Sequence, residues 1–375
     1  MNQTTGLPRT PERGWNEWLA NAHLDIWLTI FLLALGTLGL CVLYSASGHS
    51  SDMLMSQARR LVLGLAVMLV CAQVPPEWYR AIAPWFYGFT LLLLVAVLFL
   101  GDASKGAQRW LDLGIVRFQP SELMKLAMPL SIAAFLHSRL LPPRLPTVFW
   151  TLLLISLPTG LIAIQPDLGT AVLVVCAGMF ALYFAGWNWR WIAGAFAAAG
   201  AAAYPLWHGL HDYQRQRVLT FLNPESDPLG AGYHITQSKI AIGSGGLFGK
   251  GWLNGTQAHL EFLPESHTDF IFAVYAEELG LLGVLLLVLL YLTVVGRGLF
   301  IALRGQDSFQ RLLAGSLSLT FFLYLFINMG MVLGLLPVVG VPLPMISFGG
   351  TSMVSLLAGF GMLMSIHTHR KLISN

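Results

Sequence analysis

The residues best suited to chemistry lie just before a long apolar run, in the segment Pro264-Glu265-Ser266-His267-Thr268-Asp269. A carboxylate at the edge of the hydrocarbon is costly unless it is paired, hydrated or functional, so Asp269 is a candidate functional group. The alternative is helix N-capping, for which Ser266, Thr268 and Asp269 are all suitable residues. The sequence leaves both roles open.

His267 and Asp269 are also spaced as two ligands of a divalent cation. Two ligands do not make a metal site, and no third ligand is evident nearby, so the sequence identifies no metal. A hydrolase triad of Ser266, His267 and Asp269 is not expected, because the members of such triads come from separated segments. A divalent cation stays a candidate cofactor, and no other cofactor is indicated.

A second candidate pair follows the sequence Phe118-Gln119-Pro120-Ser121, where Glu122 and Lys125 stand three residues apart. At this spacing an acid and a base can pair on one face of a helix. The pair either pins its helix to a neighbour or lines a hydrated groove, where it orients a substrate phosphate or tunes another carboxylate. The sequence does not decide between these roles.

Other polar residues are expected on the same side of the membrane as Asp269. Asp167 follows Gln165-Pro166 in a short turn at a helix start, so N-capping is its favoured role. Arginine pairs bind phosphate in a fork geometry, and phosphate on this side would belong to a lipid or a lipid-linked sugar. A solvated loop is the simpler explanation for any single one of these basic residues, which are Arg109, Arg215, Arg217 and Lys239.

Two segments are predicted to be irregular. The glycine-rich stretch 243–251 lacks the glycine and the hydroxyl residue that a Walker A loop requires, at Ser244 and Gly251. It is expected to form a tight turn whose amides could bind an anion. The proline-rich connection 337–345 and the Gly349-Gly350 pair after it either pack helices closely or face a hydrated groove.

These residues must be positioned by membrane helices, because 56% of the 375 residues are hydrophobic and only 10% are charged. The cysteines lie within apolar runs and predict no disulfide framework. We expect an all-α polytopic membrane protein, a single transmembrane domain over residues 1–375. Its ten predicted spans are 25–43, 61–74, 81–100, 121–136, 148–164, 168–185, 191–206, 270–295, 312–336 and 346–366.

The distribution of basic residues predicts the orientation of these spans. Ten spans with both termini in the cytoplasm put the basic short loops inside, as the positive-inside rule requires. A large outer loop, 207–268, then connects the seventh and eighth spans. Asp269, Asp167, Glu122 and Arg109 all come to the outer membrane surface on this topology.

Six segments together closely resemble the SEDS family of cell-wall proteins. They are GAQRWLDLG from Gly106, FQPSELMK from Phe118, QPDLGT from Gln165, NPESDPLGAGYHITQSKIAIGSGGLFGKGW from Asn223, PESHTDFIFAVYAEELG from Pro264 and PLPMISFGGTS from Pro342. The resemblance covers nearly the whole chain and favours the elongation branch of the family over the septal branch. It implies a ten-span peptidoglycan glycosyltransferase of the bacterial inner membrane that polymerises lipid II on the periplasmic face.

By the same resemblance, Asp269 matches the essential aspartate of the family, and Glu122 and Lys125 match its fourth-helix pair. Arg109, Asp167, Arg215 and Lys239 match polar positions near the groove. The implied partner is a class B penicillin-binding protein, a transpeptidase that engages the large outer loop within the elongation complex. Two alternatives stay open: a lipid II flippase, which Glu277 and Glu278 inside the eighth span would suit, and a scaffold that only recruits the transpeptidase.

Overall fold

The computed structural model describes residues 23–104, 107–112, 117–188, 231–256 and 266–369, together with residues 190, 191, 193, 194, 197, 200, 215 and 219. Seven of the described helices are long and apolar enough to cross a membrane, so the predicted multi-pass helical membrane protein is confirmed. The predicted span 191–206 lies largely outside the described residues. The helices are α2 (Ile26–Ala46), α3 (Ser51–Gln73), α4 (Pro76–Leu100), α5 (Pro120–His137), α6 (Leu145–Ile164), α7 (Leu168–Phe184), α11 (Ala231–Gly245), α13 (Ile271–Leu303), α14 (Ser308–Val332) and α15 (Thr351–Thr368).

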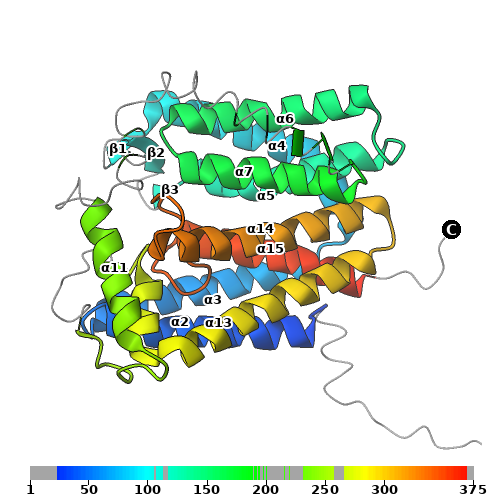
Figure 1. The fold of residues 1–375 in the computed structure, drawn as a ribbon. Coiled ribbons are helices and arrows are strands. Elements are labelled where there is room, and N and C mark those ends of the chain that lie inside the picture. The colour runs from blue at the N-terminus through cyan, green and yellow to red at the C-terminus, as the bar shows by residue number, and fades with distance from the viewer. Residues whose placement is uncertain are drawn as a thin grey trace, which may run out of the picture.

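The long helices lie roughly side by side, with α14 and α15 at the centre (Figure 1). Helices α4 to α7 cover one side of this central pair, and α2, α3 and α13 cover the other. In the apolar 18-residue stretch of each helix, 72% of the residues of α14 and 67% of those of α15 are buried. The share is 22% for α4, which faces outward along most of its length. We call the end where α2 begins and α15 ends the terminal end, and the opposite end the distal end.

Three short antiparallel strands form at the distal end, between α4 and α5. They are β1 (Asp102–Ser104), β2 (Ala107–Asp112) and β3 (Arg117–Phe118), in the order β1-β2-β3. Helix α11 lies at the same end and crosses the long helices steeply (Figure 1). The prediction of an all-α chain therefore has to be extended by these three short strands. Hydropathy predicts membrane spans but not the structure of the segments between them. In this segment the backbone groups pair across antiparallel strands.

Several helix boundaries differ from the predicted ones. Helix α3 begins at Ser51 rather than at residue 61, because the Ser50 hydroxyl caps it by accepting a bond from Met53 N (3.3 Å). Helix α15 begins at Thr351 rather than at residue 346. Hydropathy alone placed both starts wrongly: it excluded a polar first part of α3 that the fold accommodates, and it included residues 346–350, which are irregular.

The predicted single span 270–295 is a broken helix. Gly280 inside α13 has φ 64° and ψ −167°, a conformation that is essentially restricted to glycine. The glycine-rich turn fits into this break and completes the backbone hydrogen bonds that the break leaves open. The bonds run from Lys250 N to Glu277 O (3.0 Å), from Gly251 N to Glu278 O (2.9 Å), from Leu281 N to Gly246 O (3.0 Å) and from Leu282 N to Leu247 O (3.1 Å).

This arrangement decides the role of the turn. The amides of Gly249, Lys250 and Gly251 all donate to protein carbonyls, so these three amides are not available to an anion. Gly249 has φ +77°, and a Cβ there would lie 2.1 Å from Glu278 O. The turn therefore has a structural role: it fills the break in α13 and bonds the backbone groups exposed there.

The two acids inside α13, Glu277 and Glu278, hold the region of the break to neighbouring segments. Glu277 is fully buried and its Oε1 accepts bonds from Lys250 Nζ (2.5 Å) and from the Thr256 amide (3.0 Å) and hydroxyl (2.9 Å). Glu278 is also buried and accepts a bond from the Ser45 hydroxyl of α2. Both carboxylates are thus anchored to neighbouring protein groups.

At the terminal end a buried acid joins α2 to α13. Asp25 caps α2 through Leu28 N (3.0 Å), and Arg297 of α13 binds it with Nη2 at 2.7 Å and Nε at 3.0 Å. The rings of His23 and His369 stack with centroids 3.9 Å apart, which brings the start of α2 to the end of α15. Burial, and then the neighbouring His369, lower the pKa of His23, so this ring stacks in its neutral form at pH 7.

Replacing Gly280 with alanine should destabilise the protein markedly. A Cβ at this position would lie 2.3 Å from Gly249 N, and the backbone conformation alone costs about 1–3 kcal/mol for another residue. We expect a lower thermal unfolding midpoint in detergent. Gly296→Ala on the same helix is the control, since a Cβ there meets no atom within 4 Å. Equal midpoints for the two variants would show that the break is not needed.

Candidate functional site

The turn that carries Asp269 is held by its backbone. Three of its carbonyls accept bonds from other segments: His267 O from Phe348 N (2.9 Å), Thr268 O from Ser347 Oγ (2.6 Å) and Asp269 O from Asn328 Nδ2 (3.0 Å). Asn328 is fully buried in α14 and also donates to Val341 O (2.8 Å). The position of Asp269 is therefore fixed from both α14 and the connection before α15.

The Asp269 carboxylate is partly exposed and lies over Gly340, with Oδ2 3.5 Å from the place a Cβ would take there. The N-cap of α13 is Phe270, so Asp269 does not occupy the N-cap position that was its structural alternative. Ser266 does not cap the helix either, because its hydroxyl donates to Ala46 O (3.0 Å). His267 packs its ring edge-on against Phe348, with centroids 6.2 Å apart.

Arg109 and Asp167 lie on the other side of the connection that passes Asp269. A Cβ on Gly169 at the start of α7 would lie 2.5 Å from Val339 O, one residue before Gly340. Asp167 caps α7 as predicted, through Thr170 N (3.3 Å), and its other oxygen accepts from Gln119 Nε2 (3.0 Å).

Arg109 from β2 fastens the strands to this corner. Its Nε donates to Gln165 O (3.3 Å), its Nη2 donates to Pro166 O, and its Nη1 lies 3.9 Å from Asp167 Oδ1. The contacts of Arg109 and Asp167 therefore build the frame of the distal end.

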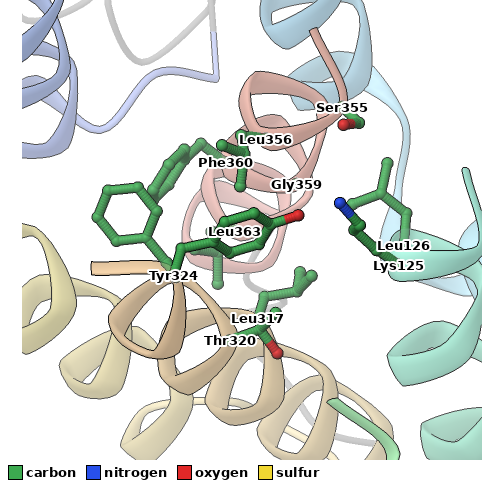
Figure 2. A pocket seen from close by; sticks show the side chains of 11 residues that line it. Lys125, Leu126, Leu317, Thr320, Tyr324, Ser355, Leu356, Gly359, Phe360 and Leu363 are labelled. Carbon is green, nitrogen blue, oxygen red and sulfur yellow. The ribbon is translucent and has the colours of Figure 1, made fainter. Parts of the chain in front are cut away.

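Glu122 and Lys125 form the predicted pair on α5, with 2.7 Å between Nζ and Oε1 and 6% of each side chain exposed. Ser355 of α15 donates to the second Glu122 oxygen (3.2 Å), and Lys125 Nζ lies 5.0 Å from the centre of the Tyr324 ring of α14. Figure 2 shows the Lys125 amine and the Tyr324 hydroxyl pointing toward each other across a small cavity of about 30 Å³. The pair thus connects α5 to both central helices.

The remaining basic candidates are Lys239, Arg215 and Arg217. Lys239 is exposed on α11, and its Nζ lies 2.7 Å from the place of a Cβ on Gly334, just after α14. A cation there complements the C-terminal end of the helix dipole. Arg215 is described only as an isolated residue, and Arg217 lies outside the described residues.

Sequence reasoning missed two residues of α3 that reach the site. Gln57 is buried and its amide bonds Ser347 O (3.0 Å) and Gly349 N (3.4 Å). The Arg60 guanidinium lies 4.4 Å from the centre of the Phe348 ring. The amide of Phe348 donates a hydrogen bond to His267 O. The signal was present as polar residues next to a short predicted span, but that span was predicted to begin at residue 61 and so excluded them.

The described residues contain no group of three or more His, Cys, Asp and Glu side chains that could hold a metal ion. His267 and Asp269 therefore gain no third His, Cys, Asp or Glu ligand in that part of the chain. A divalent cation at Asp269 would take its remaining ligands from water or from other oxygen atoms, which hard cations prefer.

Comparisons with known proteins agree on one family. The family model for FtsW, RodA and SpoVE, described as cell cycle proteins, matches residues 25–372. The chain is 56% identical over 353 residues to peptidoglycan glycosyltransferase MrdB of Escherichia coli strain K12, covering 94% of this chain and 95% of that protein. It is 37% identical over 363 residues to the probable peptidoglycan glycosyltransferase FtsW of Thioalkalivibrio sulfidiphilus, covering 92% and 90%.

Solved structures show the same fold. The crystal structure of the Thermus thermophilus rod shape determining protein RodA has a TM-score of 0.72 and 30% identity, and the match covers 95% of this chain and 100% of that one. A chain from a peptidoglycan synthase complex, described as coordinating polymerization and crosslinking, has a TM-score of 0.81 and 32% identity over 92% and 99%. The protein is thus a multi-pass helical membrane protein, and it belongs to the FtsW, RodA and SpoVE family, the SEDS family that its motifs resemble.

Replacing one member of the pair of Glu122 and Lys125 should destabilise the protein more than replacing both. Glu122→Gln or Lys125→Met leaves one charge buried, which costs about 3–5 kcal/mol, whereas the double variant should regain most of this loss. Chemical unfolding in detergent measures all three. The half-exposed pair of Arg80 and Asp307 (3.6 Å) is the control, for which Asp307→Asn should cost under about 1 kcal/mol. Additive single losses would contradict the pairing.

Proposed function

We propose that this protein is a peptidoglycan glycosyltransferase that polymerises lipid II during cell elongation, on the periplasmic face of the bacterial inner membrane. The observation that carries the proposal is the Asp269 turn, fixed by Asn328 and Ser347 at the distal end of a fold shared with the family. The 56% identity to MrdB, against 37% to a probable FtsW, supports the elongation branch over the septal branch.

The reaction makes two chemical demands. The 4-hydroxyl of one sugar attacks the anomeric carbon of the lipid-linked donor and loses its proton, while polyprenyl pyrophosphate leaves. We assign the Asp269 carboxylate as the proton acceptor, acting directly or through a bound cation. Activity measured with and without a chelator distinguishes these two routes.

Positive charge must stabilise the leaving pyrophosphate as its negative charge develops. The described contacts connect Arg60 to the Asp269 turn through Phe348. We assign it to the pyrophosphate, together with Arg215, Arg217 and Lys239 from the outer loop. Arg109, Asp167 and the pair of Glu122 and Lys125 support the site from its frame.

The flippase alternative is less well supported. A transporter needs polar groups through the depth of the membrane, and Glu277 and Glu278 were the main candidates. Their carboxylates bind Lys250, Thr256 and Ser45, which is the behaviour of structural anchors. A scaffold without activity would leave the fixed position of Asp269 without a chemical purpose.

The proposed partner is a class B penicillin-binding protein that crosslinks the new strands. The similar chain from a complex that coordinates polymerization and crosslinking supports such a pairing. We place its contact on the outer loop 207–268, half of which lies outside the described residues, and both chain termini in the cytoplasm. The large loop thereby faces the periplasm, where crosslinking takes place.

Asp269→Asn should abolish polymerisation of labelled lipid II by the purified protein, alone or with its transpeptidase partner. Loss of a general base lowers the rate by about 10²–10⁴-fold. Asp307→Asn is the matched control at the terminal end, because asparagine caps α14 as well as aspartate does. Near-normal polymer from a folded Asp269→Asn protein would exclude the base role, and no polymer from the unmodified protein with its partner would return the flippase and scaffold to consideration.

Arg60→Gln should lower polymerisation at least tenfold while the protein stays folded, because one charge-assisted contact to the leaving group is lost. Arg59→Gln removes the same charge from the adjacent, exposed position on α3 and should have little effect. The rate of strand formation from labelled lipid II measures both variants. Equal rates for the two would remove Arg60 from the site.

A further inference from the structure

A cavity of about 830 Å³ lies among α4, α5 and α6 at the terminal end, on the side of the molecule away from Asp269. Helices α4 and α6 both pack against α5. Volumes of roughly 300–1,000 Å³ are typical of sites that hold small ligands. Its wall is largely apolar and includes Pro84, Ala134, Leu153 and Leu154.

The hydroxyl groups on this wall are occupied by protein carbonyls. Tyr87 donates to Leu154 O (2.7 Å), and Ser131 donates to Ala83 O (3.1 Å). The interior thus offers few polar groups to a ligand and suits a hydrocarbon chain. Trp150, which is 55% exposed at the side of the cavity, is of the type that settles at membrane interfaces.

The rim at the terminal end is basic. Arg80 Nη1 lies 2.8 Å from His137 Nε2, and a guanidinium only donates, so Nε2 accepts. The proton of His137 is then on Nδ1, which donates to Ser308 Oγ (2.8 Å), and the ring is neutral. Arg80 is also 3.6 Å from Asp307, which offsets part of its charge.

Arg139 supplies the uncompensated charge of the rim. Its guanidinium lies 5.3 Å from the centre of the Phe135 ring, and no acid pairs with it in the described part of the chain. None of the described residues that line the cavity is acidic. Along α4 the rim at Arg80 and the inner wall at Tyr87 are about 10 Å apart. A basic rim at one end and an apolar wall about 10 Å deep match the two parts of a phospholipid.

We propose that this cavity binds an anionic phospholipid of the membrane leaflet at the terminal end, with the phosphate at Arg139 and an acyl chain between α4 and α6. Basic pockets between membrane helices recognise anionic headgroups in this way. The site lies at the opposite end of the bundle from Asp269, so it goes beyond the polymerase function and does not depend on it.

The test is lipid retention by the delipidated full-length protein, measured by native mass spectrometry after incubation with phosphatidylglycerol or phosphatidylethanolamine. We expect phosphatidylglycerol to be retained preferentially. Arg139→Gln should reduce its retention about fivefold, the factor expected for one basic side chain near an anionic headgroup. Arg304→Gln is the matched control, since Arg304 also lies over a phenylalanine ring at the terminal end (4.2 Å, Phe300) but does not line the cavity.

A second pair of variants tests the cavity itself without changing charge. Leu153→Trp fills it and should remove the bound lipid, whereas Leu157→Trp, one turn further along α6 and outside the lining, should not. Equal losses of retained phosphatidylglycerol in Arg139→Gln and Arg304→Gln would show that general surface charge, and not this site, holds the lipid, and would overturn the proposal. Equal retention of both lipids, no retained lipid, or full retention in Leu153→Trp would each overturn the proposal.

Discussion

The structure depends on one constraint, which is that backbone groups leaving a helix inside a membrane must find protein partners. Two irregular regions of the distal end meet it in the same way. The break at Gly280 is completed by the glycine-rich turn, and the turn at Asp269 is completed by Asn328 and the residues before α15. Because each irregular segment supplies the bonds another lacks, the site forms only when the helices are assembled.

Buried charge is handled by the same principle. Asp25, Asp167 and Glu277 each accept bonds from a backbone amide as well as from side chains, and each joins elements that are distant in the sequence. The pair of Glu122 and Lys125 does so between α5 and the two central helices. Asp269 differs because its backbone is fixed while its carboxylate is partly exposed beside Gly340. An acid held in this way can meet a substrate without a large rearrangement of the protein.

The two ends of the bundle have different chemical character. The distal end combines short strands, α11 and irregular turns around Asp269 (Figure 1). The terminal end combines stacked histidines, a buried ion pair and a basic rim over an apolar cavity. The ion pair and the stacked histidines stabilise the bundle there, at the end opposite Asp269.

The sequence by itself determined the membrane class, most of the spans, the pair on α5 and the cap at Asp167, and it singled out Asp269 as a candidate, because hydropathy and short-range spacing are local properties. Only the tertiary structure decided that Glu277 and Glu278 anchor a turn, that α13 is broken at Gly280, and that Gln57 and Arg60 reach the site. Each of these outcomes depends on contacts between segments far apart in the chain. A carboxylate has the same sequence signature whether it binds substrate or a neighbouring loop, and only its partners in space distinguish the two.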